Sequence, residues 1–307
     1  MKRKMDKKGF EFSFSWLFAI IVGAVIIFIA IYFTTGVIKT NQYQAGTQTA
    51  VELENLLNPV ETNLEEGKLI KINFGDETRI YNDCRNIGDF GNQVISTSTR
   101  SRIGEEWPGP GGRITSKNKY VFSEDIVQGR EVYVFAKPFE MPYKVADILM
   151  IYTGNYCFVN PPGSIEDEVS DLSLPGINVT GSKTGCPEGS KVVCFFSDNC
   201  DINVGESGAR DVYLNDGLIY AEIFSDDDLY ECQLQRLMKR GANLAEVYAD
   251  KADYLEFQGC GTRLSGSLRE FSRLLRDDYE SSSDLRAVEL KSEALEDKNE
   301  LLNCKLF

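Results

Sequence analysis

The chain has 307 residues, a formal net charge of −14 at pH 7 and no histidine. The acidic balance excludes nucleic acid as a partner, because binding to phosphates requires a basic face. The lack of histidine excludes histidine-based triads, Cys–His nucleophiles and HExxH zinc sites. The sequence also lacks a Walker loop and a nucleophile elbow, so we expect neither a cofactor nor an enzymatic activity.

A membrane-spanning segment is predicted near the N-terminus. Residues 12–38 carry no formal charge over 27 positions, and the stretch from Trp16 to Phe33 is almost purely apolar. An α-helix rises about 1.5 Å per residue, so roughly 20 residues cross the ~30 Å hydrocarbon core of a bilayer. We therefore expect one transmembrane helix at residues 12–36, in a single-pass protein whose partner is the lipid bilayer.

The flanking charges predict the orientation of this helix. The basic residues before it are Lys2, Arg3, Lys4, Lys7 and Lys8. Beyond it, Lys39 is the only basic residue before Lys68. Because positive charge stays cytoplasmic, residues 1–11 form a cytoplasmic tail and residues after about 38 are extracytoplasmic. A cleaved secretory signal peptide is the alternative, but the apolar run exceeds the usual length of about 7 to 15 residues.

The helix is expected to continue beyond the membrane as an amphipathic stalk at residues 37–58. This segment has no proline and a single glycine, Gly46. Ala50, Leu53 and Leu57 recur at helical spacing on one face. The pair Asn58-Pro59 is expected to end the helix, because the residue before proline disfavours the α region.

Residues 59–224 are expected to form a strand-rich extracytoplasmic domain. Segments rich in strand-forming residues lie at 69–74, 131–135, 146–152 and 191–196. An acidic segment, 164–172, is predicted to be a helix that completes one β-α-β unit. Asn215-Asp216-Gly217 predicts a hairpin between strands at 211–214 and 218–221, since a primed turn needs positive φ. The glycine-rich and proline-rich stretch 107–112 is expected to be a loop, with an exposed tip as one alternative.

Residues 225–307 change to a helical period. Apolar residues at 3–4 spacing predict helices over about 230–255, 264–275 and 284–302. Ser225 is the expected N-cap of the first helix, followed by three acids, Asp226 to Asp228, on its first turn. The three helices should pack together or onto the sheet. The predicted fold class is therefore α+β, with a mixed sheet between a long N-terminal helix and a helical C-terminal region.

The cysteines predict disulfides. Eight of them follow the apolar segment: Cys84, Cys157, Cys186, Cys194, Cys200, Cys232, Cys260 and Cys304. An even number on the exterior side of a membrane favours disulfides over the alternative of buried free thiols. Eight cysteines allow 105 pairings, so the connectivity is open; the last three cysteines are placed to link the helices. Asn178-Val179-Thr180 is a glycosylation sequon on the predicted outside.

Two acidic clusters are candidate sites. Asp198, Asp201, Glu206 and Asp211 lie near a cysteine-bounded loop, but their spacing differs from an EF-hand, and a solvated turn explains them better. Glu105 and Glu106 beside Trp107 suggest carbohydrate chemistry, but adjacent side chains usually point apart. We assign no catalytic, cofactor-binding or metal-binding residue.

The N-terminus carries a resemblance to a known family. A short basic leader, Met1 to Gly9, ends in Lys7-Lys8-Gly9 and precedes the hydrophobic helix. It resembles the leader of type IV pilin-like precursors, especially the archaeal kind with a class III signal. The resemblance implies that a prepilin peptidase cuts between Gly9 and Phe10. It covers about 60 of the 307 residues.

The chain also departs from that family's pattern. Bacterial pilins carry a glutamate at the fifth mature position, which here is Phe14, whereas Glu11 is the second. The helical C-terminal region and the cysteine count also differ from a simple pilin. These departures count against filament assembly more strongly than against cleavage of the leader by a prepilin peptidase.

Three functions follow from the sequence. The first is a single-pass surface protein whose disulfide-bonded extracytoplasmic domain has a structural or recognition role. The second is a pilin-like subunit of a surface filament, with other subunits at the cell surface as partners. The third, motivated only by the acidic clusters, is a membrane-tethered hydrolase that uses carboxylates.

Overall fold

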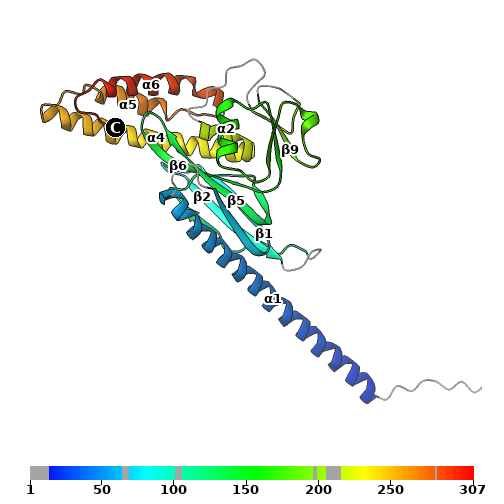
Figure 1. Cartoon of the computed structure of the whole chain (residues 1–307). Coiled ribbons are helices and arrows are strands. Elements are labelled where there is room, and N and C mark those ends of the chain that lie inside the picture. The colour runs from blue at the N-terminus through cyan, green and yellow to red at the C-terminus, as the bar shows by residue number, and fades with distance from the viewer. Residues whose placement is uncertain (1–13, 64–68, 101–105, 196–198, 205–215, 281) are drawn as a thin grey trace, which may run out of the picture.

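The computed structural model describes residues 14–63, 69–100, 106–195, 199–204, 216–280 and 282–307. A single long helix, α1, lies against one face of an extended sheet, and the helices and a second sheet cover the other face (Figure 1). The expected α+β class, with its long N-terminal helix, mixed strands and C-terminal helices, is confirmed.

Helix α1 (Phe14–Asn63) is continuous over 50 residues. At about 1.5 Å per residue it is roughly 75 Å long. The expected end at Asn58 is wrong, because the helix runs through Pro59 for a further turn. Proline removes one backbone hydrogen bond, and this loss does not break a helix that keeps its bonds on either side.

Within the described residues, six strands form the main sheet, in the order β3-β2-β1-β5-β6-β4. The strands are β1 (Leu69–Arg85), β2 (Asn92–Arg100), β3 (Ile114–Ser116), β4 (Val121–Phe122), β5 (Ile126–Glu140) and β6 (Lys144–Tyr152). Neighbours are antiparallel except for β4 and β6, which are parallel. The strands expected at 69–74, 131–135 and 146–152 are thereby confirmed.

Strand β5 shows why this sheet is covered on both faces. Val132 and Val134 pack with Leu53 and Leu57 of α1. Phe135 and Phe139 belong to the core on the opposite face, among the helices. Because side chains alternate across a strand, one apolar stretch supplies two cores.

A second sheet is parallel throughout its described strands, in the order β10-β9-β7-β8. The strands are β7 (Tyr156–Val159), β8 (Ile177–Thr180), β9 (Lys191–Phe195) and β10 (Ile202–Val204). Helix α2 (Gly163–Asp171) joins β7 to β8, which confirms the expected β-α-β unit. A short 3₁₀ turn, η1 (Lys183–Gly185), precedes β9.

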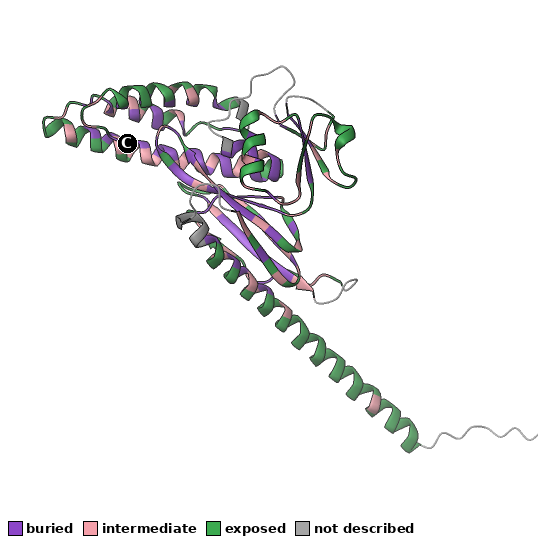
Figure 2. Cartoon of the chain, viewed as in Figure 1, coloured by how far each residue is buried: buried purple, intermediate pink, exposed green. Residues whose placement is uncertain are grey.

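The helical region packs directly onto the main sheet. Its elements are α3 (Asp216–Phe224), α4 (Asp227–Phe257), α5 (Ser265–Leu274), the 3₁₀ turn η2 (Ser282–Leu285) and α6 (Arg286–Glu300). The three predicted helices are confirmed as α4, α5 and α6. Helices α4 and α5 share one core with β5, β6, β7 and β9 (Figure 2), so the sheet and the helices form a single body.

Two local predictions here are wrong. Residues 218–221 belong to α3 and are not a hairpin strand, while 211–214 lie outside the described residues. A short apolar run fits either period, and burial of Tyr220 against Phe135, at 5.3 Å between ring centroids, is satisfied by the helix. The N-cap of α4 is Asp226, one residue after the expected Ser225. Its carboxylate accepts a hydrogen bond from the Asp125 N–H at 2.6 Å instead of capping its own helix.

All eight cysteines are paired, as Cys84–Cys232, Cys157–Cys186, Cys194–Cys200 and Cys260–Cys304. The expected disulfides are confirmed. Cys260–Cys304 links the segments that follow α4 and α6, as expected for a staple between helices. Cys232 instead joins α4 to β1, over a sequence separation of 148. Cross-links that close long loops contribute about 2–5 kcal/mol, so this one holds the helical region on the sheet.

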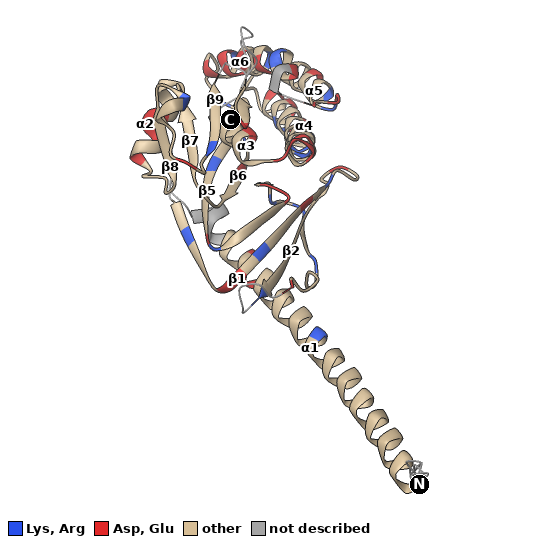
Figure 3. Ribbon diagram, turned by 90° about the vertical axis from the view of Figure 1, so that its right-hand side faces the viewer, with Lys and Arg blue, Asp and Glu red and all other residues tan. Residues whose placement is uncertain are grey.

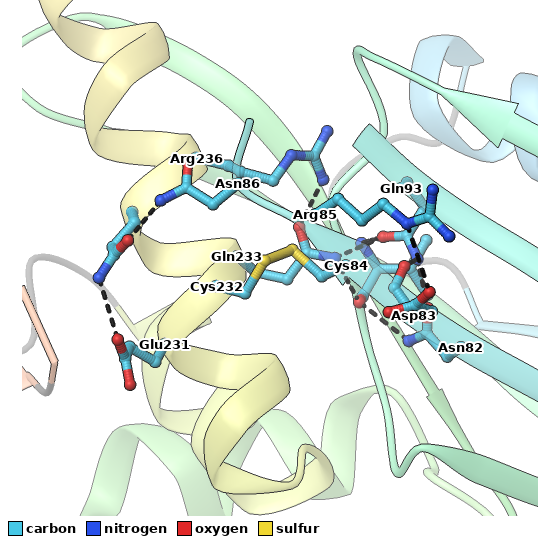
Figure 4. Close-up of a disulfide and its surroundings, with 12 residues drawn as sticks. Asn82, Asp83, Cys84, Arg85, Asn86, Gln93, Glu231, Cys232, Gln233 and Arg236 are labelled. Atoms are coloured by element: carbon cyan, nitrogen blue, oxygen red, sulfur yellow. Dashed lines mark hydrogen bonds and ion pairs between the residues drawn. A yellow bond between two sulfur atoms is a disulfide. The ribbon is translucent and has the colours of Figure 1, made fainter. Parts of the chain in front are cut away.

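A buried polar network surrounds the Cys84–Cys232 disulfide (Figure 4). Gln233 of α4 donates to Gln93 of β2, and Gln93 donates in turn to Asn82 of β1. Arg236 is fully buried. Its guanidinium donates to the Gln233 amide oxygen at 2.7 Å and to the Lys119 carbonyl at 3.0 Å. Hydrogen bonds to α4 therefore come from strand β2 and from the segment between β3 and β4.

The same network reaches α1 through Lys119. The Lys119 ammonium lies 2.8 Å from the Glu54 carboxylate and donates to the Glu54 carbonyl at 2.9 Å. The two side chains are only 2% and 18% exposed. Because buried ion pairs are costly to leave half-made, this contact fixes α1 to the head, the part of the chain from residue 69 onward.

Substituting Lys119 tests this contact. Lys119→Ala leaves the Glu54 carboxylate without its counterion and should lower the free energy of unfolding by about 3–5 kcal/mol. The measurement is urea unfolding of the full chain in detergent micelles. The control is Lys71→Ala, which breaks a solvated pair with Glu131 at the same 2.8 Å separation and should hardly move the midpoint. Equal midpoints for the two variants would contradict the assignment.

Candidate functional site

The first half of α1 has the length, composition and exposure of a membrane-spanning helix. Every residue from Phe14 to Ile38 is exposed except Gly23. An 18-residue window of this helix has a mean hydropathy of 2.8 and no buried residue. The Thr34 hydroxyl donates to the Ala30 carbonyl at 2.7 Å, so this polar group is satisfied within the helix, as a lipid environment requires. No second helix in the described ranges meets the same criteria.

The second half of α1 belongs to the core of the head. Ala50, Leu53 and Leu57 are at most 1% exposed, which confirms the predicted apolar stripe. The predicted stalk, residues 37–58, is therefore free of the head over only its first few residues, because the head contacts the helix from Tyr43 onward. The anchor and the head are joined without a flexible linker.

The loop 107–112 docks on α1 through Gly111 and Gly112, while Gly109 and Pro110 at its tip are exposed, as one alternative had it. The Gly112 N–H donates to the Thr47 hydroxyl at 2.6 Å, and the Gly111 N–H donates to the Thr97 carbonyl at 2.9 Å. The Thr97 hydroxyl donates to the Gly46 carbonyl at 2.7 Å. These bonds join the loop, strand β2 and the helix at one point.

Gly46 permits this close approach. A Cβ atom at position 46 would lie 2.6 Å from the Thr97 carbonyl oxygen, inside contact distance of a backbone atom. Glycine is the residue that allows two backbones to come this near. The single glycine of the predicted stalk therefore marks the place where α1 meets the head. This glycine is a feature of the sequence that could have located the contact.

The acidic clusters are only partly within the described residues. Glu106 is exposed, and Trp107 stacks with Arg79 and Arg100, whose guanidinium carbons lie 4.2 and 4.4 Å from its ring centroid. Glu105 lies outside the described residues. So do Asp198, Glu206 and Asp211 of the other cluster.

The remaining sequence-predicted residues are accounted for separately. Asp201, just before β10, accepts a hydrogen bond from the Val192 N–H of β9 at 2.8 Å. Asn178 is exposed on β8, the edge of the second sheet, where a glycan is sterically accessible. Within the part of the chain that is described, no three His, Cys, Asp or Glu side chains are placed to hold a metal ion. Gly9 and Phe10 lie outside the described residues.

The structure brings together an acidic cleft that the sequence did not reveal. It has a volume of about 1030 Å³ and lies where the α3–α4 junction meets β9, β10 and residues 124–125. Its acidic lining comprises Glu124, Asp125, Asp201, Glu222, Asp226, Asp227 and Asp228. Burial, together with the charges of Asp226, Asp228 and Asp83, raises the pKa of Asp125. The three aspartates at the start of α4 were assigned only to the helix end, because Asp125 lies 101 residues away from Asp226 in the sequence.

No family model, no curated protein and no solved structure matches this chain. The geometry of the anchor and the head therefore carries the functional argument.

Two glycines of α1 provide a matched test of the junction. In a free helix, Gly→Ala stabilises by about 1 kcal/mol. Gly36→Ala should follow this rule, since no atom lies within 4 Å of the new methyl group. Gly46→Ala should instead lower the unfolding midpoint and expose α1 to protease near residue 46, because the methyl group meets the Thr97 carbonyl. Stabilisation by both substitutions would contradict the close junction.

The acidic cleft makes stability depend on pH. A carboxyl whose folded pKa is raised contributes stability that is complete below its unfolded pKa, about 3.9, and is lost as pH rises through its folded pKa. Asp125→Asn should therefore raise the urea midpoint at pH 7.5, and the gain should shrink as pH falls toward about 4. Asp89→Asn, at an exposed carboxyl outside the cleft, serves as the control. A gain that is constant with pH would contradict the cause assigned.

Proposed function

We propose that this chain is a single-pass surface protein, with its N-terminus in the cytoplasm and a disulfide-bonded head outside the membrane. The observation that carries the proposal is the division of α1 into an exposed apolar half and a half buried in the head. The four disulfides support an extracytoplasmic head, because disulfides persist in oxidising compartments. The basic residues before the span support this orientation.

The role we propose for the head is structural or recognition rather than catalytic. The head's buried polar side chains are used in scaffold contacts, as Gln233, Arg236 and Lys119 illustrate. The direct passage of α1 from membrane to core also favours a structural role. A head held this way keeps one orientation relative to the bilayer, whereas a linker would let it swivel.

A pilin-like subunit is the second candidate, and a specific observation favours it. The buried half of α1 packs on an antiparallel part of the sheet, while Tyr43, Val51 and Leu56 on the same half stay between 42% and 54% exposed. The apolar half of the rod, with these exposed side chains beyond it, offers apolar contacts to neighbouring subunits. Recovery of the native protein only as a monomer from membranes would count against this candidate.

The N-terminal residue of the native protein separates the two candidates. Mass spectrometry of the terminal peptide, from membranes of the native source, should find Met1, or Lys2 after methionine removal, for a surface protein with an uncleaved anchor. A start at Phe10 would instead indicate prepilin-type processing and favour the filament subunit. A start near Gly36 would contradict both, because the chain would have lost its anchor.

Protease treatment of intact cells tests the orientation. Trypsin added outside should release peptides from the head, including the segment that carries Asn178, while the basic tail stays protected until the membrane is opened. The reverse pattern, with the tail released and the head protected, would contradict the proposed orientation.

A further inference from the structure

The base of the head is the end that faces the membrane. Figure 3 shows the bend of β1, near residues 73–78, as the part of the sheet nearest the apolar half of α1. The uncharged run of α1 ends at Ile38, and Tyr43 already contacts the loop of residues 106–112. Five residues of helix span only about 7–8 Å, so there is no room for a spacer between the bilayer and the head.

The length of the uncharged run sets the level of Lys39. Its 25 described residues, Phe14 to Ile38, extend about 38 Å as a helix. A bilayer with its headgroups is about 40–45 Å thick. Lys39, the first charge after the run, therefore lies at the level of the outer headgroups, and its stem allows the ammonium to reach the lipid phosphates.

A cavity opens beside Lys39. It has a volume of about 610 Å³ and lies between α1 and the loop that docks on it. Helix α1 lines it with Lys39, Gln42 and Tyr43, and the loop lines it with residues 106–110. An ammonium, an amide, a phenol and the indole of Trp107 border this cavity, and these groups donate hydrogen bonds to phosphate oxygens.

Further cations gather around Trp107 in a chain whose net charge is −14. Arg79 and Arg100 stack with its ring. Arg100 pairs with Glu77 at 2.8 Å, and Arg130 is exposed next to them and helps to lower the pKa of Glu77. Glu106 is the exposed acid of the cavity. The acidic cleft is built from other elements, the start of α4 with β9 and β10, so the cations at the base stand apart from it.

We propose that the base of the head binds the phosphate groups of the bilayer lipids that surround α1. Lys39 and Arg130 contact the phosphates, and Trp107 lies at the membrane interface, where indole rings prefer to lie. The inference rests on the proposed membrane anchor and adds a second contact with the membrane, which fixes the tilt of the rod. A neighbouring copy on the same surface is the competing occupant.

The two tryptophans of the chain allow a direct test. Trp16→Phe leaves Trp107 as the only tryptophan, whose emission is excited selectively over that of the tyrosines, and Trp107→Phe leaves Trp16, inside the span, as an insertion control. Each full-length variant is reconstituted into phosphatidylcholine vesicles. The vesicles contain phosphatidylcholine labelled with a nitroxide either on the headgroup or deep in the acyl chain. The inference predicts that the headgroup label quenches Trp107 strongly and that the deep label does so weakly.

The outcomes separate this inference from the proposed function. Quenching of Trp16 without quenching of Trp107 would overturn the lipid contact while leaving the anchor intact, and this is the result expected if a neighbouring copy covers the base. Quenching of neither tryptophan would overturn the anchor and the inference with it.

A charge series tests recognition of phosphate. In the Trp16→Phe background, Lys39→Gln with Arg130→Gln should reduce headgroup quenching of Trp107 by about half or more, because the ammonium and the guanidinium that hydrogen-bond the lipid phosphates are lost. Lys298→Gln with Lys305→Gln removes the same charge from exposed positions at the C-terminal end and should change nothing. Unchanged quenching in the first pair would overturn phosphate recognition, and equal urea midpoints for all variants would exclude misfolding as the cause of a loss.

Discussion

A buried pair of cations, Lys119 and Arg236, joins the three layers of this protein. Lys119 holds Glu54 of α1 with its ammonium and accepts from Arg236 of α4 with its carbonyl. Burial lowers the pKa of Arg236 to about 10, so the side chain stays protonated at neutral pH. Carbonyl oxygens and the ring of Tyr120, 4.7 Å away, compensate its charge. A half-satisfied buried network costs more than an apolar core. The network therefore fixes α1, the main sheet and the C-terminal helices in one position relative to each other.

This network, with the Cys84–Cys232 disulfide beside it, explains how a membrane helix becomes part of a folded head. Leu53 and Leu57 make the apolar contact with the sheet, and Gly46 lets the helix backbone approach β2 closely. The ion pair of Lys119 with Glu54 fixes the orientation of the helix. The second half of α1 and the sheet thus form one folded unit, from which the apolar half of the helix extends. That property supports both proposed roles, a fixed surface display and a subunit of an assembly.

Much of the fold followed from local patterns. The apolar run, the stripe of Ala50, Leu53 and Leu57, and the 3–4 spacing after residue 230 each predict a helix, and the structure agrees with all three. The hairpin at 218–221 failed because a short apolar run satisfies two periods, and only contact with Phe135 decides between them. The acidic cleft, the cavity beside Lys39 and the pairing of Cys84 with Cys232 depend on residues far apart in sequence, which no local pattern encodes.

The second half of α1 folds and unfolds together with the head, because its apolar side chains belong to the same core. Hydrogen exchange of the full chain in lipid nanodiscs tests this coupling, by comparing the amides of residues 46–57 with those of β2. We expect equal, slow exchange in both segments, because both open only when the core unfolds. Exchange in residues 46–57 that is many-fold faster than in β2 would contradict it, since the helix would then be a stalk that merely rests against the sheet.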